Sequence, residues 1–220
     1  VVIDAGALER EVTWKIAVNN ITSEGYYGHT DNLDWDRPAK LGISLGEKVP
    51  NDAILIAGQH DKSLQWEGMP DLGTYAVQTI QRVQKYTDRP ILMRFHPRCQ
   101  PFIPHHRFKM LLQNENIYNC DIEIPKPVVN TYDVFDIDYA FHTVINHCSG
   151  PGINAVIAGS NVLVDKKSLA YPMSIKLNQI ENPPQKRNKD RWLVEISHTE
   201  YTVDEIAEGL WLTRLKNALE

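Results

Sequence analysis

The sequence predicts an α/β protein built around a parallel sheet. Between residues 53 and 164, short apolar runs alternate with segments of helical periodicity, which is the pattern of repeated strand–helix units. The run at 53–57 is continuously apolar, as parallel strands are when helices cover both faces of the sheet. Residues 144–164 read as strand, Gly-rich turn, helix and strand, which is the length of a compact βαβ unit.

The N-terminal part has a different pattern. Residues 1–3 read as a buried strand, and residues 8–21 carry apolar side chains at alternate positions, as a second strand does. Residues 25–40 are rich in Gly, Asp and Asn and read as a loop. A Pro-Asn-Asp break then places a candidate domain boundary between residues 46 and 52.

The remaining elements follow in order. Strands are expected at residues 53–57, 91–93, 118–124, 144–145 and 162–164, and helices at 72–83, 108–112 and 153–158. Two helical pieces close the chain, the first around Trp192 and the second opening with the capping box Thr202–Glu205 and continuing to Leu215.

Composition narrows the class of protein. The chain has 220 residues, 23% charged residues and a net charge of −5, which fits a soluble globular protein and gives no sign of a nucleic-acid partner. No apolar run approaches the roughly 20 residues of a membrane span, and the N-terminus lacks the features of a secretory signal. The three cysteines are far apart and odd in number, so free thiols in a reducing, cytoplasmic compartment are expected. Their spacing with the histidines matches no zinc motif.

Polar side chains cluster where three of the expected strands end. Ligands of open parallel sheets bind beyond the carboxyl ends of the strands, and guanidinium or imidazole groups beside a helix N-terminus suit a diphosphate. The Gly-rich turn alone would equally fit an ordinary connection that binds nothing. The clusters are Gln59, Lys62, Ser63 and Gln65; Arg94, His96 and Arg98; and His147, Ser149, Gly150 and Gly152.

Candidates for acid–base chemistry lie near the N-terminus. Asp4 ends the first strand, close to Glu9 and Arg10, and a carboxylate there can deprotonate a hydroxyl acceptor or serve a structural role. Trp35 lies in an acidic, aromatic loop that would either shape an acceptor pocket or be pinned by its own rings. Ser149 has no identifiable triad, which argues against a hydrolase.

At these residues the chain resembles a family. Gly58-Gln59 with Ser63, the run RFHPR at 94–98 and the run SGPGINAVIAG at 149–159 resemble, in order and spacing, the donor-binding half of GT-B glycosyltransferases. The closest resemblance is to capsule-polysaccharide-type transferases and to glycosyltransferases of tailed bacteriophages. The segments VVIDAGALERE, DWDRPAKLGI, YTDRPILMRFHPR and DRWLVEISHTEYTVDEI resemble the phage members.

The resemblance implies Rossmann-like parallel sheets of the GT-B type, with a truncated or minimal N-terminal acceptor domain, because two such domains usually need a longer chain. The expected units are an acceptor side at 1–48, a nucleotide-sugar domain at 49–185 and C-terminal helices at 186–220 that pack back across both. It also implies that the diphosphate of a nucleotide sugar is held by His96, Arg98, Ser149, Gly150 and Gly152. Relatives often have Glu, which binds the ribose of the nucleotide, where this chain has Asn154. Asn154 would bind the ribose less strongly than Glu.

The resemblance also implies the reaction and its partners. The donor is expected to be a UDP-sugar, and no metal is expected, since no Asp-x-Asp motif lies at the diphosphate site. Arg10 and Trp35 are the candidate acceptor contacts. The phage members imply a hydroxylated or hydroxymethylated pyrimidine in DNA as acceptor, and the host cytoplasm as location. A polysaccharide is the alternative acceptor. A non-catalytic nucleotide-binding module is the alternative to an enzyme.

Overall fold

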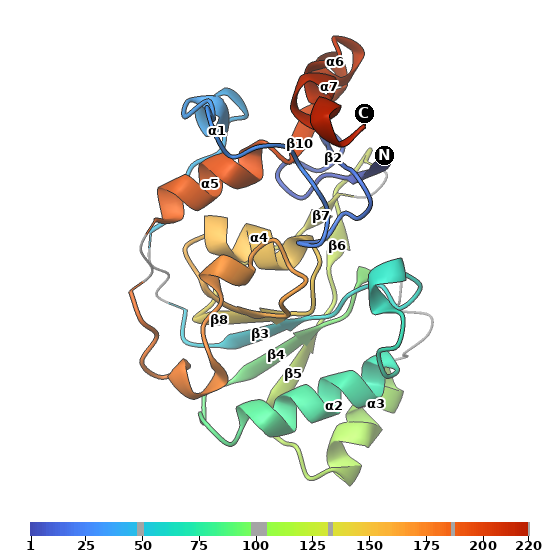
Figure 1. The fold of residues 1–220 in the computed structure, drawn as a ribbon. Helices are drawn as coiled ribbons and strands as arrows, with labels where there is room; N and C mark the ends of the chain where they lie inside the picture. Colours follow the sequence, from blue (N-terminus) through green and yellow to red (C-terminus); the bar gives the residue numbers. More distant parts are fainter. Residues whose placement is uncertain (48–50, 98–104, 132–133, 186–187, 220) are drawn as a thin grey trace.

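A computed structural model describes residues 1–47, 51–97, 105–131, 134–185 and 188–219 (Figure 1). At its centre lies a parallel sheet with the strand order β5-β4-β3-β8-β9. The strands are β3 (Ile54–Ala57), β4 (Ile91–Arg94), β5 (Cys120–Glu123), β8 (Thr143–Asn146) and β9 (Asn161–Val164). The chain fills the sheet outward from β3, first to one side and then to the other. The topological switch point therefore lies between β3 and β8.

Helices cover both faces of this sheet. On one face lie α2 (Leu72–Val83) and α3 (His105–Asn114), and on the other α4 (Gly150–Ile157) and α5 (Lys189–Ser197) (Figure 1). Alternation along β3 serves both layers, because Ile54 and Ile56 pack toward α2 whereas Leu55 and Ala57 pack toward α4. The expectation of an α/β fold around a parallel sheet, with its strands buried on both faces, is confirmed.

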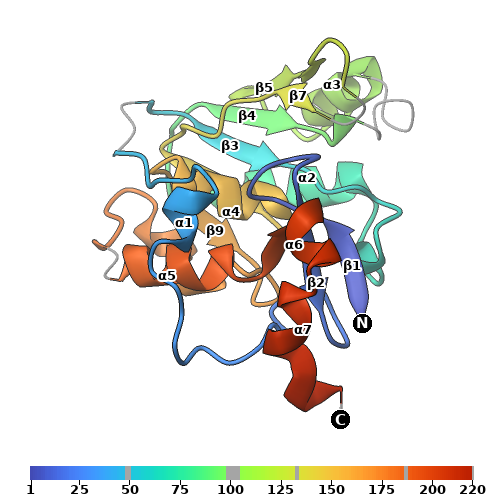
Figure 2. The ribbon, with the colours of Figure 1, turned by 90° about the horizontal axis from the view of Figure 1, so that it is seen from above.

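The N-terminal strands belong to a second, antiparallel sheet with the order β1-β2-β10. It joins β1 (Val2–Ala5) and β2 (Thr13–Ala17) to β10 (Glu200–Thr202), so both ends of the chain meet in one sheet (Figure 2). The expected parallel arrangement does not extend to this part, and β10 was not foreseen. The division into units at 1–48, 49–185 and 186–220 stays a prediction.

Two local expectations were wrong. The first strand is not buried: β1 lies at the edge of the small sheet, and Ile3 is 55% exposed. The last expected helix is two helices, α6 (Val203–Ala207) and α7 (Leu210–Leu215), because Gly209 between them adopts φ +75°, a left-handed conformation that ends α6. The capping box of Thr202 and Glu205 at the start of α6 is confirmed.

The remaining elements are short. The loop expected at 25–40 ends in a helical turn, α1 (Arg37–Lys40). The others are the hairpin strands β6 (Lys126–Pro127) and β7 (Phe135–Asp136), and the 3-10 helices η1 (Leu64–Trp66), η3 (Tyr171–Met173), η4 (Leu177–Gln179) and η5 (Lys216–Ala218). Within the described ranges, no helix has the length and apolar character that crossing a bilayer requires.

Candidate functional site

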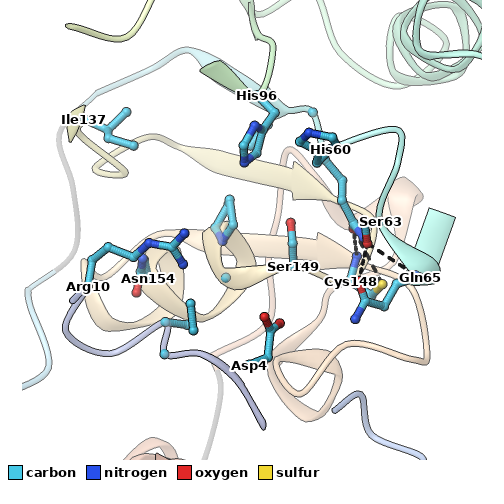
Figure 3. Close-up of a pocket in the computed structure, with 18 of the residues that line it drawn as sticks. Asp4, Arg10, His60, Ser63, Gln65, His96, Ile137, Cys148, Ser149 and Asn154 are labelled. Carbon is cyan, nitrogen blue, oxygen red and sulfur yellow. Dashed lines mark hydrogen bonds between the residues drawn. The ribbon is translucent and has the colours of Figure 1, made fainter. Parts of the chain in front are cut away.

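A cavity of about 560 Å³ opens at the carboxyl ends of β3, β4 and β8. Its walls are the loops that follow these three strands, the first turn of α4, the segment at 134–139, and the small sheet with the segment that joins β1 to β2 (Figure 3). Its volume is within the usual range for small-molecule sites, and its position at a sheet's switch point is where such sites form. Ten of the predicted site residues line this cavity: Asp4, Arg10, Gln59, Ser63, Gln65, Arg94, His96, Ser149, Gly150 and Asn154.

Hydrogen bonds hold the two loops at the switch point together. The Asn146 side-chain amide donates to the Ala57 carbonyl at 2.8 Å, and the Cys148 N–H donates to Gln59 Oε1 at 3.2 Å. Gln59 is 3% exposed, and its amide donates in turn to Ser63 Oγ at 3.1 Å. Gln59 therefore lines the cavity chiefly as the residue that fixes the β3 loop against the β8 loop.

The N-terminus of α4 faces the cavity through Ser149 and Gly150. Ser149 is the N-cap residue, but its hydroxyl makes no capping bond; it bonds instead with the Asn146 side chain, whose amide donates at 3.0 Å. The first N–H groups of a helix have no acceptor within the helix, and the macrodipole makes this end positive. A Cβ at Gly150 would lie 3.1 Å from Ala7 Cβ, so a glycine at this position lets the segment after β1 pack closely against the start of α4. The geometry suits an anion such as a phosphate.

Two histidines form the opposite wall. The rings of His60 and His96 meet edge to face with centroids 5.1 Å apart, and both lie across the cavity from Ser149 (Figure 3). Imidazole N–H groups there can donate to a ligand oxygen.

Arg94, at the end of β4, is held by the protein itself. It is 4% exposed, and its Nε and Nη2 donate to Glu123 Oε2 at 2.9 and 2.7 Å. The guanidinium also lies 5.3 Å from the centre of the Tyr139 ring. Arg94 was expected, together with His96 and Arg98, to face a diphosphate, but Glu123 already supplies the counter-charge of Arg94. Arg98 lies outside the described residues.

The small sheet contributes the acidic group. Asp4 points into the cavity toward Ser149, while Arg10 reaches in beside Asn154 (Figure 3). Behind them lies Glu200, a fully buried carboxylate that nothing in the sequence pattern marks. It accepts the Ala7 N–H at 2.7 Å and the Leu8 N–H at 3.0 Å, and so fixes the chain just after Asp4.

Five predicted site residues do not line this cavity. Glu9, Lys62 and Trp35 are exposed outside it, and Trp35 is 62% exposed on the loop before α1. His147 turns to the other side of the sheet, where it lines a second cavity of about 260 Å³. Gly152 is buried in packing, since a Cβ there would lie 3.0 Å from Val164 Cγ1. The small glycine at 152 is thus explained by the close approach of α4 to β9.

His60, Lys15 and Cys148 are cavity residues that sequence reasoning missed. Lys15, on β2, lines the cavity although only 7% of the residue is exposed. Cys148 lies beside Gln59, and burial raises the pKa of its thiol to about 11, so the thiolate needed for nucleophilic chemistry is scarce at neutral pH. Among the described residues, no group of three or more His, Cys, Asp and Glu side chains is placed to hold a metal ion.

Ser149 also lacks the partner that a nucleophile needs. The described hydrogen bonds of its hydroxyl all involve Asn146, which cannot act as a general base, so the geometry does not form a catalytic triad.

Comparison with known proteins finds similarity to solved structures. No protein-family model matches the chain, and no curated protein matches its sequence. Among solved structures, KpsC of Thermosulfurimonas dismutans, a beta Kdo 2,7 transferase, is similar: the match covers 99% of this chain and 77% of that one, with a TM-score of 0.51 and 14% identity. At this identity the likeness concerns the fold. The chain therefore shares its α/β fold with a glycosyltransferase of known structure.

Proposed function

We propose that the protein is a glycosyltransferase that moves a sugar from a nucleotide sugar to a hydroxyl acceptor. The observation that carries the proposal is the pairing of two opposed groups across one cavity: the positive N-terminus of α4 on the sheet side and the carboxylate of Asp4 on the small-sheet side. Glycosyl transfer requires both, a group that stabilises a leaving phosphate and a base for the acceptor hydroxyl.

The donor side is built from α4 and the histidine wall. The Gly150 N–H and Ser149 lie at the positive helix end, and His96 faces them across the cavity, so a nucleotide's phosphates would accept hydrogen bonds from both walls. Negative charge grows on the phosphate as the glycosidic bond breaks. These contacts would therefore strengthen in the transition state and accelerate transfer. The proposed donor is a UDP-sugar, bound without a metal ion.

The acceptor side is built from the small sheet. Asp4 would take the proton of the acceptor hydroxyl as its oxygen attacks the anomeric carbon and the nucleotide leaves. Arg10 lies within reach of the same space. In this proposal the small sheet serves as a minimal acceptor side of the GT-B type.

We favour a carbohydrate hydroxyl as the acceptor. A solved structure with this fold is a transferase of Kdo, and the chain's net charge of −5 gives no support to binding along a nucleic acid. A modified pyrimidine in phage DNA, implied by the sequence resemblance, is the competing acceptor.

Calorimetry with UDP, CMP and the corresponding nucleotide sugars tests the donor site. His96→Ala and Ser149→Ala should each weaken binding about ten- to a hundredfold, as expected for loss of a charge-assisted hydrogen bond. His106→Ala, on the exposed side of α3, is the matched control and should bind like the parent. If the parent protein binds none of these nucleotides, the proposal is refuted.

Mass spectrometry of acceptors then tests the reaction. Incubation with nucleotide sugars and a panel of oligosaccharides and modified DNA should add one sugar mass to one class of acceptor, and transfer should persist in EDTA. Nucleotide binding with no transfer to any acceptor would indicate a non-catalytic module.

A further inference from the structure

Lys15 is a largely buried lysine that lines the cavity and lies between two carboxylates in the small sheet. It lies in the middle strand of the small sheet, directly across from Asp4 on β1 and from Glu200 on β10. The residue is 7% exposed and lines the cavity. In the part of the chain that the structure describes, its ammonium makes no hydrogen bond and no ion pair within 4.0 Å.

The stem of Lys15 is buried, whereas its ammonium, which no described protein group satisfies, remains available to water or to an anionic ligand in the cavity. The buried carboxylate across from Lys15, that of Glu200, accepts hydrogen bonds from other groups: the Ala7 N–H, the Leu8 N–H and, at 2.7 Å, the Thr13 hydroxyl. Asp4 offsets the charge of Lys15 across the strand pair, but it provides no hydrogen bond. Because Lys15 lines the cavity, its ammonium can donate hydrogen bonds to a ligand there.

The described lining of the cavity carries three cationic side chains, Arg10, Lys15 and Arg94, and one carboxylate, Asp4. Two further carboxylates lie behind this lining: Glu123 pairs with Arg94, and Glu200 lies across from Lys15 on β10. Of the three cations, Lys15 is the one that lies directly across from Asp4 in the small sheet.

The position of Lys15 indicates which part of a substrate it would meet. Residues directly opposite in antiparallel strands have Cβ atoms about 4.5–5.5 Å apart, so Lys15 and Asp4 emerge side by side from the same face. A hydroxyl that is deprotonated by Asp4 must lie within hydrogen-bonding reach of it. The molecule that contacts Lys15 is therefore the one that carries the reacting hydroxyl.

We propose that Lys15 binds an anionic group of the acceptor, and that the acceptor is an acidic sugar whose carboxylate or phosphate lies a few ångströms from the reacting hydroxyl. Lys15 is then a specificity-determining residue, which favours acidic over neutral acceptors. This inference rests on the proposed glycosyltransferase function, because that function makes Asp4 the base. It adds the chemical class of the acceptor.

Matched monosaccharides test the subsite directly. Glucuronate and glucose differ only by a carboxylate in place of a hydroxymethyl group, and glucose 6-phosphate presents a phosphate at the same carbon. Each is titrated into ¹⁵N-labelled protein while the backbone amide signals of Asp4, Ala5 and Lys15 are followed, with and without saturating nucleotide.

The acidic sugars should shift these signals, and glucose should not. Lys15→Met should weaken glucuronate or glucose 6-phosphate about ten- to a hundredfold, and Lys15→Arg should restore most of the affinity. Lys109→Met, an exposed lysine on α3, is the control. Thermal melting of Lys15→Met separates loss of binding from loss of fold, and Lys15→Arg provides the test if the Met variant unfolds.

The outcomes are distinct. A preference for glucuronate over glucose 6-phosphate identifies a carboxylate subsite, and the reverse a phosphate subsite. Equal binding of glucose, or full affinity of Lys15→Met for the acidic sugars, would overturn the inference while leaving nucleotide binding intact. If no nucleotide binds to the parent protein, the proposed function itself fails, and that result comes from a separate titration.

Discussion

Replacement of Glu200 by Gln should both destabilise the protein and displace the wall of the cavity that carries Asp4. Glu200 is fully buried and accepts three hydrogen bonds, from the Ala7 N–H, the Leu8 N–H and the Thr13 hydroxyl. Gln has nearly the same shape but offers one acceptor oxygen, and its amide nitrogen would face a donor. At least one bond to a charged acceptor is lost, and one buried N–H is left without a partner.

The magnitude follows from these two terms. A hydrogen bond to a charged group contributes about 1.5–3 kcal/mol, and a buried donor left unpaired costs about 1–3 kcal/mol. We therefore expect a loss of about 2.5–6 kcal/mol in the free energy of unfolding. For a chain of this size that corresponds to a fall in melting temperature of about 5–24 °C.

Urea unfolding followed by tryptophan fluorescence measures the loss, and Trp14 on β2 lies next to the perturbed bonds in sequence. Glu195→Gln is the control, because Glu195 forms only a partly exposed pair with Arg191 at 2.9 Å and should cost no more than about 0.5 kcal/mol.

Activity provides a second readout of the same change. Transfer by the fraction of Glu200→Gln that remains folded should fall, since the chain that carries Asp4 is released, whereas nucleotide affinity at α4 should hold. A variant within about 1 kcal/mol of the parent, or one with full transfer activity, would refute the role assigned to Glu200.

Three further predictions concern acid stability, thiol reactivity and the acceptor. Burial alone would raise the pKa of Glu205, but hydrogen bonds from Arg37 and from the Thr202 N–H bring this pKa below its ordinary value. Ionised Glu205 therefore stabilises the folded state above the unfolded-state pKa of about 4.3, and this stabilisation is lost as the pH falls through the lower pKa of the folded state. Glu205→Gln should flatten the acid side of the stability profile, and an unchanged profile would contradict the assignment. Because burial raises the pKa of Cys148 to about 11, iodoacetamide should label it far more slowly than free cysteine near neutral pH; rapid labelling would show that the thiol is activated. If DNA is the acceptor, its affinity should fall steeply between about 50 and 200 mM salt as counterions are released, whereas affinity for a carbohydrate that binds through one charge should change little.

Periodicity determined the part of the fold that depends on local pattern. Continuous apolar runs marked β3 and β8, helical spacing marked α2, and the capping box marked the start of α6, because burial on both faces or on one stripe leaves a direct trace in the sequence. The same logic located Ser149 and His96 at the cavity, since residues that follow parallel strands must meet at one edge of the sheet.

Only the tertiary structure decided which side chains at that edge share a space. His147 follows β8 as directly as Ser149 does, but it packs edge to face against Trp66 on the other side of the sheet. Arg94 follows β4, and its fork is held by Glu123 from the neighbouring strand. Neighbouring residues of an extended chain point to opposite faces of the sheet. Beyond the end of a strand, no pattern of residue types determines which face a given side chain takes.

The small sheet shows the limit most clearly. Its strand β10 comes from near the C-terminus and pairs with β2, so that Glu200 bonds to Ala7 across 193 positions and Lys15 comes to lie between two carboxylates. Neither residue is marked by its neighbours in sequence. The sequence alone determined the layered α/β sheet and the edge at which a ligand would bind, because those follow from periods of two and 3.6 residues. The buried charges that shape the cavity were decided by long-range pairing, which local periodicity does not encode.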